Sequence, residues 1–191
     1  MSEITIAIVV ILVIVVFYTI SIYNRLVALR HNVTEAWANI DVLLKQRHDE
    51  LPQLIESCKQ YMTHEKDTID AVTKGREQSD RARATGDTAA IGKSEAVLGT
   101  ALTQLFARAE AYPDLKAVET FKNLMGRISV LQGSISDRRE YFNDSVNLYN
   151  IRIDQFPDVM MARMGGFTPK ELFKVPESDK EDVDVKSLFN S

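Results

Sequence analysis

The chain has 191 residues, a formal net charge of −4 and one cysteine, Cys58. A single cysteine excludes a framework of intrachain disulfides. Lys and Arg are spread along the chain rather than gathered on one stripe, which argues against nucleic-acid binding.

The first predicted element is an apolar run from Ile4 to Tyr23 that contains no charged residue. About twenty helical residues span about 30 Å, the hydrocarbon thickness of a bilayer. A cleavable signal peptide is the alternative. The run is longer than the usual signal core, Met1-Ser2-Glu3 carries no Lys or Arg, and no small-residue cleavage site follows. The sequence therefore predicts a retained transmembrane anchor in residues 1–24.

The cations nearest the anchor predict its orientation. Arg25 and Arg30 follow the run, whereas Glu3 precedes it. Because Lys and Arg favour the cytoplasmic side of a membrane span, we expect the N-terminus outside and residues 25–191 in the cytoplasm. The predicted location is the inner (plasma) membrane, crossed once.

Apolar residues at steps of three and four continue from Leu26 to Met62, a spacing typical of a helix that packs in a bundle or coiled coil. No helix breaker separates Tyr23 from Arg25, so the membrane helix is expected to continue directly into this one. Pro52 removes a backbone donor and predicts a kink near residues 46–49.

Three further helical segments follow. The first covers about residues 63–85 and ends in a loop at 84–87, where Asp87 or Thr88 can cap the next helix. The second runs from about Ile91 to Ala109. The third is long, starts near Pro113 and ends at about Asp154, before Phe156-Pro157.

The predicted fold is all-α: a transmembrane helix that continues into an elongated antiparallel bundle of three to four helices. The bundle covers residues 25–164, and residues 165–191 form a flexible acidic tail. Val185, Leu188 and Phe189 near the end of the tail leave two interpretations open, a partner-docking peptide and an inert end.

No constellation of residues indicates catalysis. Glu-x-x-His motifs are absent, His31, His48 and His64 are too far apart to share a metal ion, and each is interpreted as a surface residue. Cys58 lies on the apolar seam and is expected to be a packed thiol. The sequence thus predicts no catalytic residue, no cofactor and no metal, and a protein that is not an enzyme.

Charged residues interrupt the apolar faces of both long helices. These residues are Asp41, Arg47, Asp49 and Arg139. We expect them to form buried ion pairs that fix the register of the helices rather than to catalyse a reaction.

Four stretches of the sequence resemble the LemA family. They are Tyr23 to Leu54, with Ala36-Trp37-x-x-Ile40-Asp41; Tyr61 to Glu65; Ala111 to Ala117, with Ala111-Tyr112-Pro113-Asp114; and Arg139 to Pro157, with Tyr149-Asn150. The resemblance reaches from the anchor to about Phe167. The chain departs from the family pattern at Phe142, where Tyr is usual, and at Leu172-Phe173-Lys174.

The resemblance implies a bacterial inner-membrane protein with a short outside N-terminus, a cytoplasmic helical bundle and no enzymatic activity. Its motif residues carry over as packing and capping positions: Trp37, Tyr112, Pro113, Tyr149, Asn150, Phe156 and Pro157.

Two functions remain open on the sequence. The first is a non-catalytic scaffold that self-associates on the membrane, since two helices are far longer than a domain of this size needs. The alternative is an adaptor or regulatory partner of another membrane protein, such as a protease or a signalling kinase, acting through the bundle or the tail.

Overall fold

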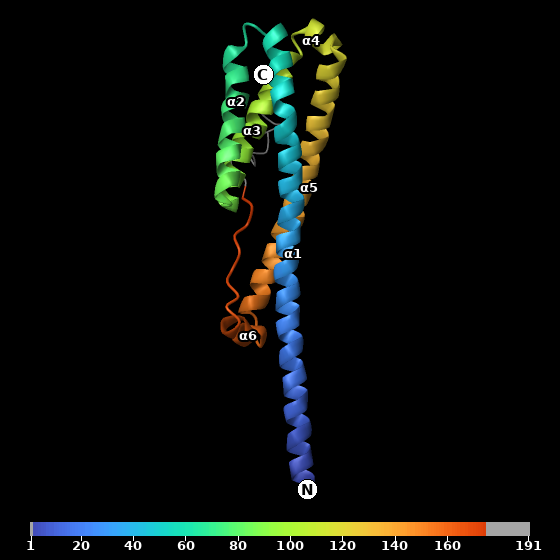
Figure 1. Ribbon diagram of the computed structural model, residues 1–191, viewed down its shortest axis with the longest axis vertical. Helices are drawn as coiled ribbons and strands as arrows, with labels where there is room; N and C mark the ends of the chain where they lie inside the picture. Colours follow the sequence, from blue (N-terminus) through green and yellow to red (C-terminus); the bar gives the residue numbers. More distant parts are fainter. Residues whose placement is uncertain (1, 175–191) are drawn as a thin grey trace, which may run out of the picture. The chain divides into compact units, whose positions relative to one another are not determined.

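The computed structural model describes residues 2–174, and within them every regular element is a helix (Figure 1). In chain order these are α1 (Glu3–Tyr61), α2 (Lys66–Thr85), α3 (Thr88–Ala109), α4 (Pro113–Ala117), α5 (Glu119–Asp154) and α6 (Asp158–Met164). The predicted all-α class is confirmed for this part of the chain.

Helix α1 is a single helix of 59 residues that contains the apolar run at its start. The predicted continuity across Tyr23 and Arg25 is confirmed. Pro52 lies inside the helix and is exposed, between the buried Leu51 and Leu54. The proline ring therefore faces solvent and the helix continues past it, while the kink near residues 46–49 stays a prediction.

The chain divides into two compact units. Unit 1 contains the residues up to Val42 together with Ile135–Leu172, and unit 2 contains Leu43–Ser134 and the chain from Phe173 onward. Helices α1 and α5 are each divided between the units, with one part in unit 1 and the other part in unit 2.

The core of unit 1 lies between the first part of α1 and the last part of α5. Buried residues recur at steps of three and four on both helices, the spacing by which one helix face meets another. They are Leu26, Val33, Ala36 and Ile40 on α1, and Phe142, Val146, Tyr149 and Ile153 on α5. Trp37 and Phe142 pack ring against ring, with centroids 5.5 Å apart.

The core of unit 2 draws buried residues from α1, α2, α3, α4 and α5, and α2 packs beside α3 (Figure 1). Its members are Leu51, Leu54, Ile55, Cys58 and Met62; Ile69 and Val72; Leu98, Ala101, Leu102, Leu105 and Ala109; Leu115; and Phe121, Leu124 and Ile128. Each of these helices is thus held by an apolar face, the main source of helix stability in proteins.

The predicted loop between α2 and α3 is confirmed, and so is the predicted N-cap of α3 at Asp87. Gly86 ends α2 with φ of 69°, and its N–H donates to the Arg83 carbonyl. A positive φ of this kind suits glycine because it has no Cβ. The Asp87 carboxylate then accepts the N–H groups of Ala89 and Ala90 and caps α3.

The predicted single helix from Pro113 to Asp154 is wrong at one point, because Val118 separates α4 from α5. Val118 is extended, with φ of −71° and ψ of 113°. Leu115 and Phe121 are both buried in the unit 2 core, and a continuous helix would set them about 120° apart. The break turns both side chains into the same core.

Residues 165–172 belong to the segment for which flexibility is predicted, yet they are held against unit 1. The Tyr149 hydroxyl donates to the Thr168 carbonyl at 3.0 Å. The Asn150 amide donates to the Lys170 carbonyl and accepts the Lys170 N–H, both at 2.9 Å. Buried Phe167 adds apolar contact. The predicted docking peptide around Val185 lies outside the described residues.

Candidate functional site

The first feature with functional meaning is the apolar run at the start of α1. None of its most apolar 18 residues is buried by the rest of the protein. By length and composition it can cross a membrane. Large apolar side chains such as Ile11 and Phe17 are 60% and 69% exposed, so water would face a continuous apolar surface that a bilayer would cover.

The two arginines that predict orientation follow this run on α1, and both are exposed. Arg30 lies over the ring of Phe167, with its guanidinium carbon 5.1 Å from the ring centroid. The same ring meets Tyr23 edge-on, at 5.8 Å between centroids. One aromatic residue from the C-terminal segment therefore contacts α1 where the apolar run ends.

A buried ion pair joins three helices of unit 2. Arg47 on α1 binds Glu95 on α3, and the two side chains are 3% and 8% exposed. The Ser79 hydroxyl on α2 donates to the other carboxylate oxygen of Glu95. Two charges that share hydrogen bonds in this way offset part of the cost of leaving water.

Of the residues predicted to form buried pairs, Arg47 does so with a partner that the prediction missed. Glu95 lies one turn after Ile91 and one turn before Leu98, on the apolar face of α3, and that position was the available signal. Asp49 is exposed, whereas Asp41 and Arg139 are half-buried.

His48 is not the surface residue that the sequence suggested. Its side chain is 13% exposed and its Nε2 lies 2.8 Å from Nη2 of Arg76 and 3.3 Å from Asp80. Burial lowers the pKa of His48, the Arg76 charge lowers it further, and Asp80 and Asp49 partly oppose the shift. In its neutral form the imidazole can accept the Arg76 N–H at Nε2. His31 and His64 are exposed, as predicted.

Cys58 is fully buried, and burial raises the pKa of its thiol to about 12. The thiolate is the reactive form of cysteine, so this residue is a packed thiol, as predicted. Within residues 2–174, no group of three His, Cys, Asp or Glu side chains is placed to hold a metal ion.

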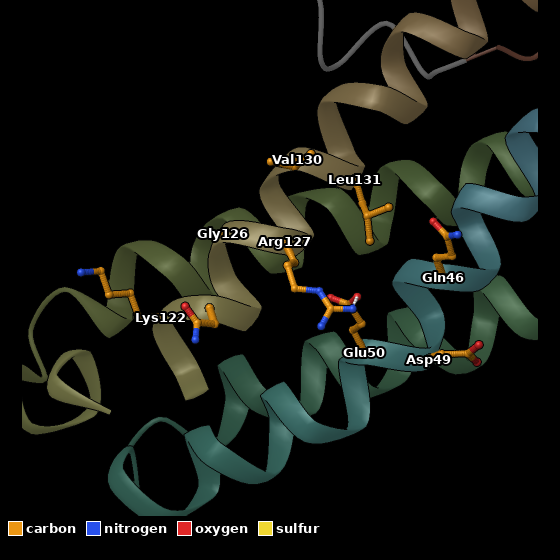
Figure 2. A pocket seen from close by; sticks show the side chains of 9 residues that line it. Gln46, Asp49, Glu50, Lys122, Gly126, Arg127, Val130 and Leu131 are labelled. Atoms are coloured by element: carbon orange, nitrogen blue, oxygen red, sulfur yellow. Dashed lines mark hydrogen bonds and ion pairs between the residues drawn. The ribbon is translucent and has the colours of Figure 1, made fainter. Parts of the chain in front are cut away.

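A groove in unit 2 lies between α1 and α5 and has a volume of about 900 Å³. It is lined by Gln46, Asp49 and Glu50 from α1 and by Lys122, Asn123, Gly126, Arg127, Val130 and Leu131 from α5. Figure 2 shows Arg127 and Glu50 pointing toward each other across it, where they form an ion pair. Val130 is 69% exposed beside them.

Some of the remaining motif residues make contacts within the protein, and one is exposed. Tyr112 precedes α4 and its hydroxyl lies 3.5 Å from Glu65, while Pro113 opens α4, where proline suits the first helical turn. Tyr149 and Asn150 hold residues 168–170. Phe156, for which packing is implied, is 77% exposed, and Pro157 follows it before α6.

Comparison with known proteins shows which proteins the chain is similar to and which protein family it belongs to. The chain is 25% identical to magnetosome protein MamQ 2 of Paramagnetospirillum magneticum, over 87% of this chain and 70% of that protein. It is 30% identical to magnetosome protein MamQ of Magnetospirillum gryphiswaldense, over 48% of this chain and 34% of that protein. The sequence profile of the LemA family matches residues 36–187, most of the chain, and the chain therefore belongs to the LemA family.

Proposed function

We propose that the chain is a membrane-anchored, non-catalytic helical scaffold that self-associates at the bacterial inner membrane. The observation that carries the proposal is α1, in which an exposed apolar run continues without a break into the buried cores of both units. A rigid helix of this kind fixes a helical bundle directly to the bilayer. Membership of the LemA family and similarity to magnetosome proteins support a membrane-associated protein.

Self-association is supported by an exposed apolar stripe on the part of α5 that belongs to unit 1. Tyr141, Leu148 and Ile151 are 55%, 53% and 62% exposed and lie at steps of seven and three. This spacing is the seam of a two-helix contact. Anchoring in one plane raises the local concentration of copies, so a modest stripe can suffice.

The experiment is light scattering of the full chain in detergent over a range of protein concentrations. We expect particles larger than one chain plus its micelle, and we expect Leu148→Glu with Ile151→Glu to reduce them to single chains. A matched pair, Ser129→Glu with Asn147→Glu, adds the same charge at exposed polar positions of α5 and should leave the particle size unchanged. A wild-type chain that is monomeric at every concentration would contradict the proposal.

The orientation belongs to the same proposal: the short N-terminus outside and the helical domain in the cytoplasm. Arg25 and Arg30 support it because both are exposed at the end of the apolar run, where cations hold the cytoplasmic side.

An adaptor for another membrane protein is the second candidate function, and the groove between α1 and α5 favours it. The groove combines the exposed side chain of Val130 with the Arg127–Glu50 ion pair, a mixture suited to a peptide segment with apolar and charged residues. In this role a partner protease or kinase would be recognised without chemistry in the chain itself.

A photo-crosslinking residue at position 130 separates the two functions. The adaptor role predicts a discrete adduct with a different protein, formed in membranes at natural abundance. The same residue at position 97, a valine on α3 that is 51% exposed against 69% for Val130, is the control. Adducts with the chain itself alone, or equal adducts from both positions, would remove the groove from consideration.

A further inference from the structure

The level of α6 along the membrane helix follows from the pairing of α1 with α5 in unit 1. Trp37 packs on Phe142, and the Arg30 charge acts on the Tyr149 hydroxyl, whose pKa is raised mainly by burial. From the first pair to the second, the position moves seven residues back along α1 and seven residues forward along α5. The two helices are therefore antiparallel. Five further residues bring Arg25 level with Asp154, where α5 ends. Helix α5 therefore ends where the apolar run of α1 ends.

Four contacts hold α6 and the residues after it at this level. Phe167, just after α6, meets Tyr23 and lies under Arg30. The Phe167 N–H donates to the Ala162 carbonyl at 2.9 Å. At the start of α6, Asp158 binds Arg152 of α5 at 3.1 Å. In Figure 1 the first part of α1 extends beyond α6 toward the N-terminus.

Helix α6 and the turn before it have two different faces. Asp158 and Ala162 are buried against unit 1. Phe156, Met160 and Met164 recur every four residues and are 77%, 60% and 82% exposed. Water would meet a row of large apolar side chains at the point where the chain returns to the end of the apolar run.

We propose that α6 is an interfacial helix that lies on the bilayer, with Phe156, Met160 and Met164 inserted among the lipid headgroups and upper acyl chains. The inference rests on the proposed membrane anchoring of α1. Short helices with an apolar face insert in this way, and flexible methionine and aromatic rings suit the irregular boundary. Exposed Arg25 and Arg163 are placed to meet lipid phosphates, which attract cations near a surface.

The bilayer, rather than a second copy, is the occupant because Phe167 holds this exposed face at the level where the apolar run ends. Tyr23 is exposed at the same level, and Ile20 is exposed one turn closer to the N-terminus. The stripe proposed for self-association starts at Ile151, five residues before Phe156, and runs away from α6 along α5 to Tyr141, about 15 Å further at the helical rise. The two proposed contacts therefore belong to different elements, α5 and α6.

The test is spin labelling of the full chain in vesicles of phosphatidylethanolamine and phosphatidylglycerol. Met164→Cys carries the label, Leu12→Cys in the apolar run is the lipid reference, and Val97→Cys on α3 is the water reference. The wild-type chain should take no label, because Cys58 is buried and its pKa of about 12 keeps it protonated. Collisions with oxygen report lipid, and collisions with a water-soluble nickel chelate report solvent.

We expect the label at 164 to show an oxygen-to-nickel collision ratio several-fold above that at 97 and below that at 12, because position 12 lies deeper in the bilayer than the headgroup level. Nickel access at 164 equal to that at 97 would overturn the inference. Low access to both reagents at 164 would show a protein cover, such as a second copy, and would also overturn it. Nickel access at 12 would instead contradict the anchor itself. Met160→Cys repeats the measurement if the first variant folds poorly.

Discussion

At the scale of single residues, the Arg47–Glu95 pair constrains how three helices of unit 2 meet. Its members are 3% and 8% exposed, and Ser79 shares the carboxylate. Removing one charge leaves the other buried without a counter-charge, which costs about 3 to 5 kcal/mol in comparable pairs. We predict that Arg47→Met lowers the free energy of unfolding of the full chain in detergent by that order.

The control for this prediction is Lys45, an exposed residue two positions before Arg47. Lys45→Met should change the unfolding free energy little, because exposed charges contribute little. Adding Glu95→Gln to Arg47→Met should recover part of the loss, since the amide keeps an acceptor for Ser79 without a buried charge. If the double variant is as unstable as the sum of the two single variants, the residues are not coupled as described.

His48 should make the stability of unit 2 depend on pH. Its pKa is lowered in the folded chain, first by burial and then by Arg76, and returns to about 6.5 on unfolding. The unfolded chain therefore binds more protons below that pH, and stability must fall as the pH drops through this range. The contribution of His48 is fully present above about 6.5.

The measurement is chemical denaturation at a series of pH values for the wild type and His48→Gln. Glutamine keeps an acceptor for Arg76 but does not titrate, so the loss of stability on acidification should be smaller in the variant. His64→Gln, at an exposed position, should behave as the wild type. An unchanged pH dependence in His48→Gln would contradict the assignment.

At the scale of elements, the close approach of α3 to the end of the described chain gives a further prediction. A Cβ built on Gly92 would lie 2.3 Å from the Lys174 carbonyl oxygen, closer than side chains tolerate. We predict that Gly92→Ala displaces the segment that contains the buried Phe173 and speeds tryptic cleavage at Lys174. Limited proteolysis followed by mass spectrometry measures the rate.

The matched control is Gly126→Ala on α5, where an added Cβ meets no atom within 4 Å. This substitution should leave the cleavage rate unchanged and raise helix stability slightly, because alanine is the better helix former. Equal cleavage rates in Gly92→Ala and the wild type would mean that the contact does not hold the segment.

Elements governed by local pattern were predictable from the sequence. The continuity of α1 follows from the absence of a breaker near Tyr23, and the start of α3 follows from the capping chemistry of Asp87. The break at Val118 was not predictable, because it depends on bringing Leu115 and Phe121 to one core. Nothing in the local sequence encodes that requirement.

The same distinction applies to the candidate sites. The apolar run and buried Cys58 are properties of one helix and can be read from spacing. The Arg47–Glu95 pair joins residues far apart in the sequence, so its partner needs tertiary information, although the place of Glu95 on an apolar face was a signal. The outward direction of Phe156 was missed because a family motif marks a residue without fixing its direction.

At the scale of the whole molecule, we propose an anchor, two helical units and an interfacial helix. The anchor determines the rest, because both self-association in one plane and the contact of α6 with lipid require that α1 crosses the bilayer. Its orientation rests on Arg25 and Arg30. Replacing both with Glu while placing Lys at Ser2 and Glu3 should weaken or invert the topology.

Protease protection in spheroplasts tests this central claim most directly. We predict that the wild-type chain stays in the membrane after an alkaline wash, and that external protease spares the helical domain until the membrane is permeabilised. The charge-swapped chain should be cut from outside. Release of the wild-type chain by the alkaline wash would contradict the anchor, and digestion of its domain in intact spheroplasts would contradict the cytoplasmic location.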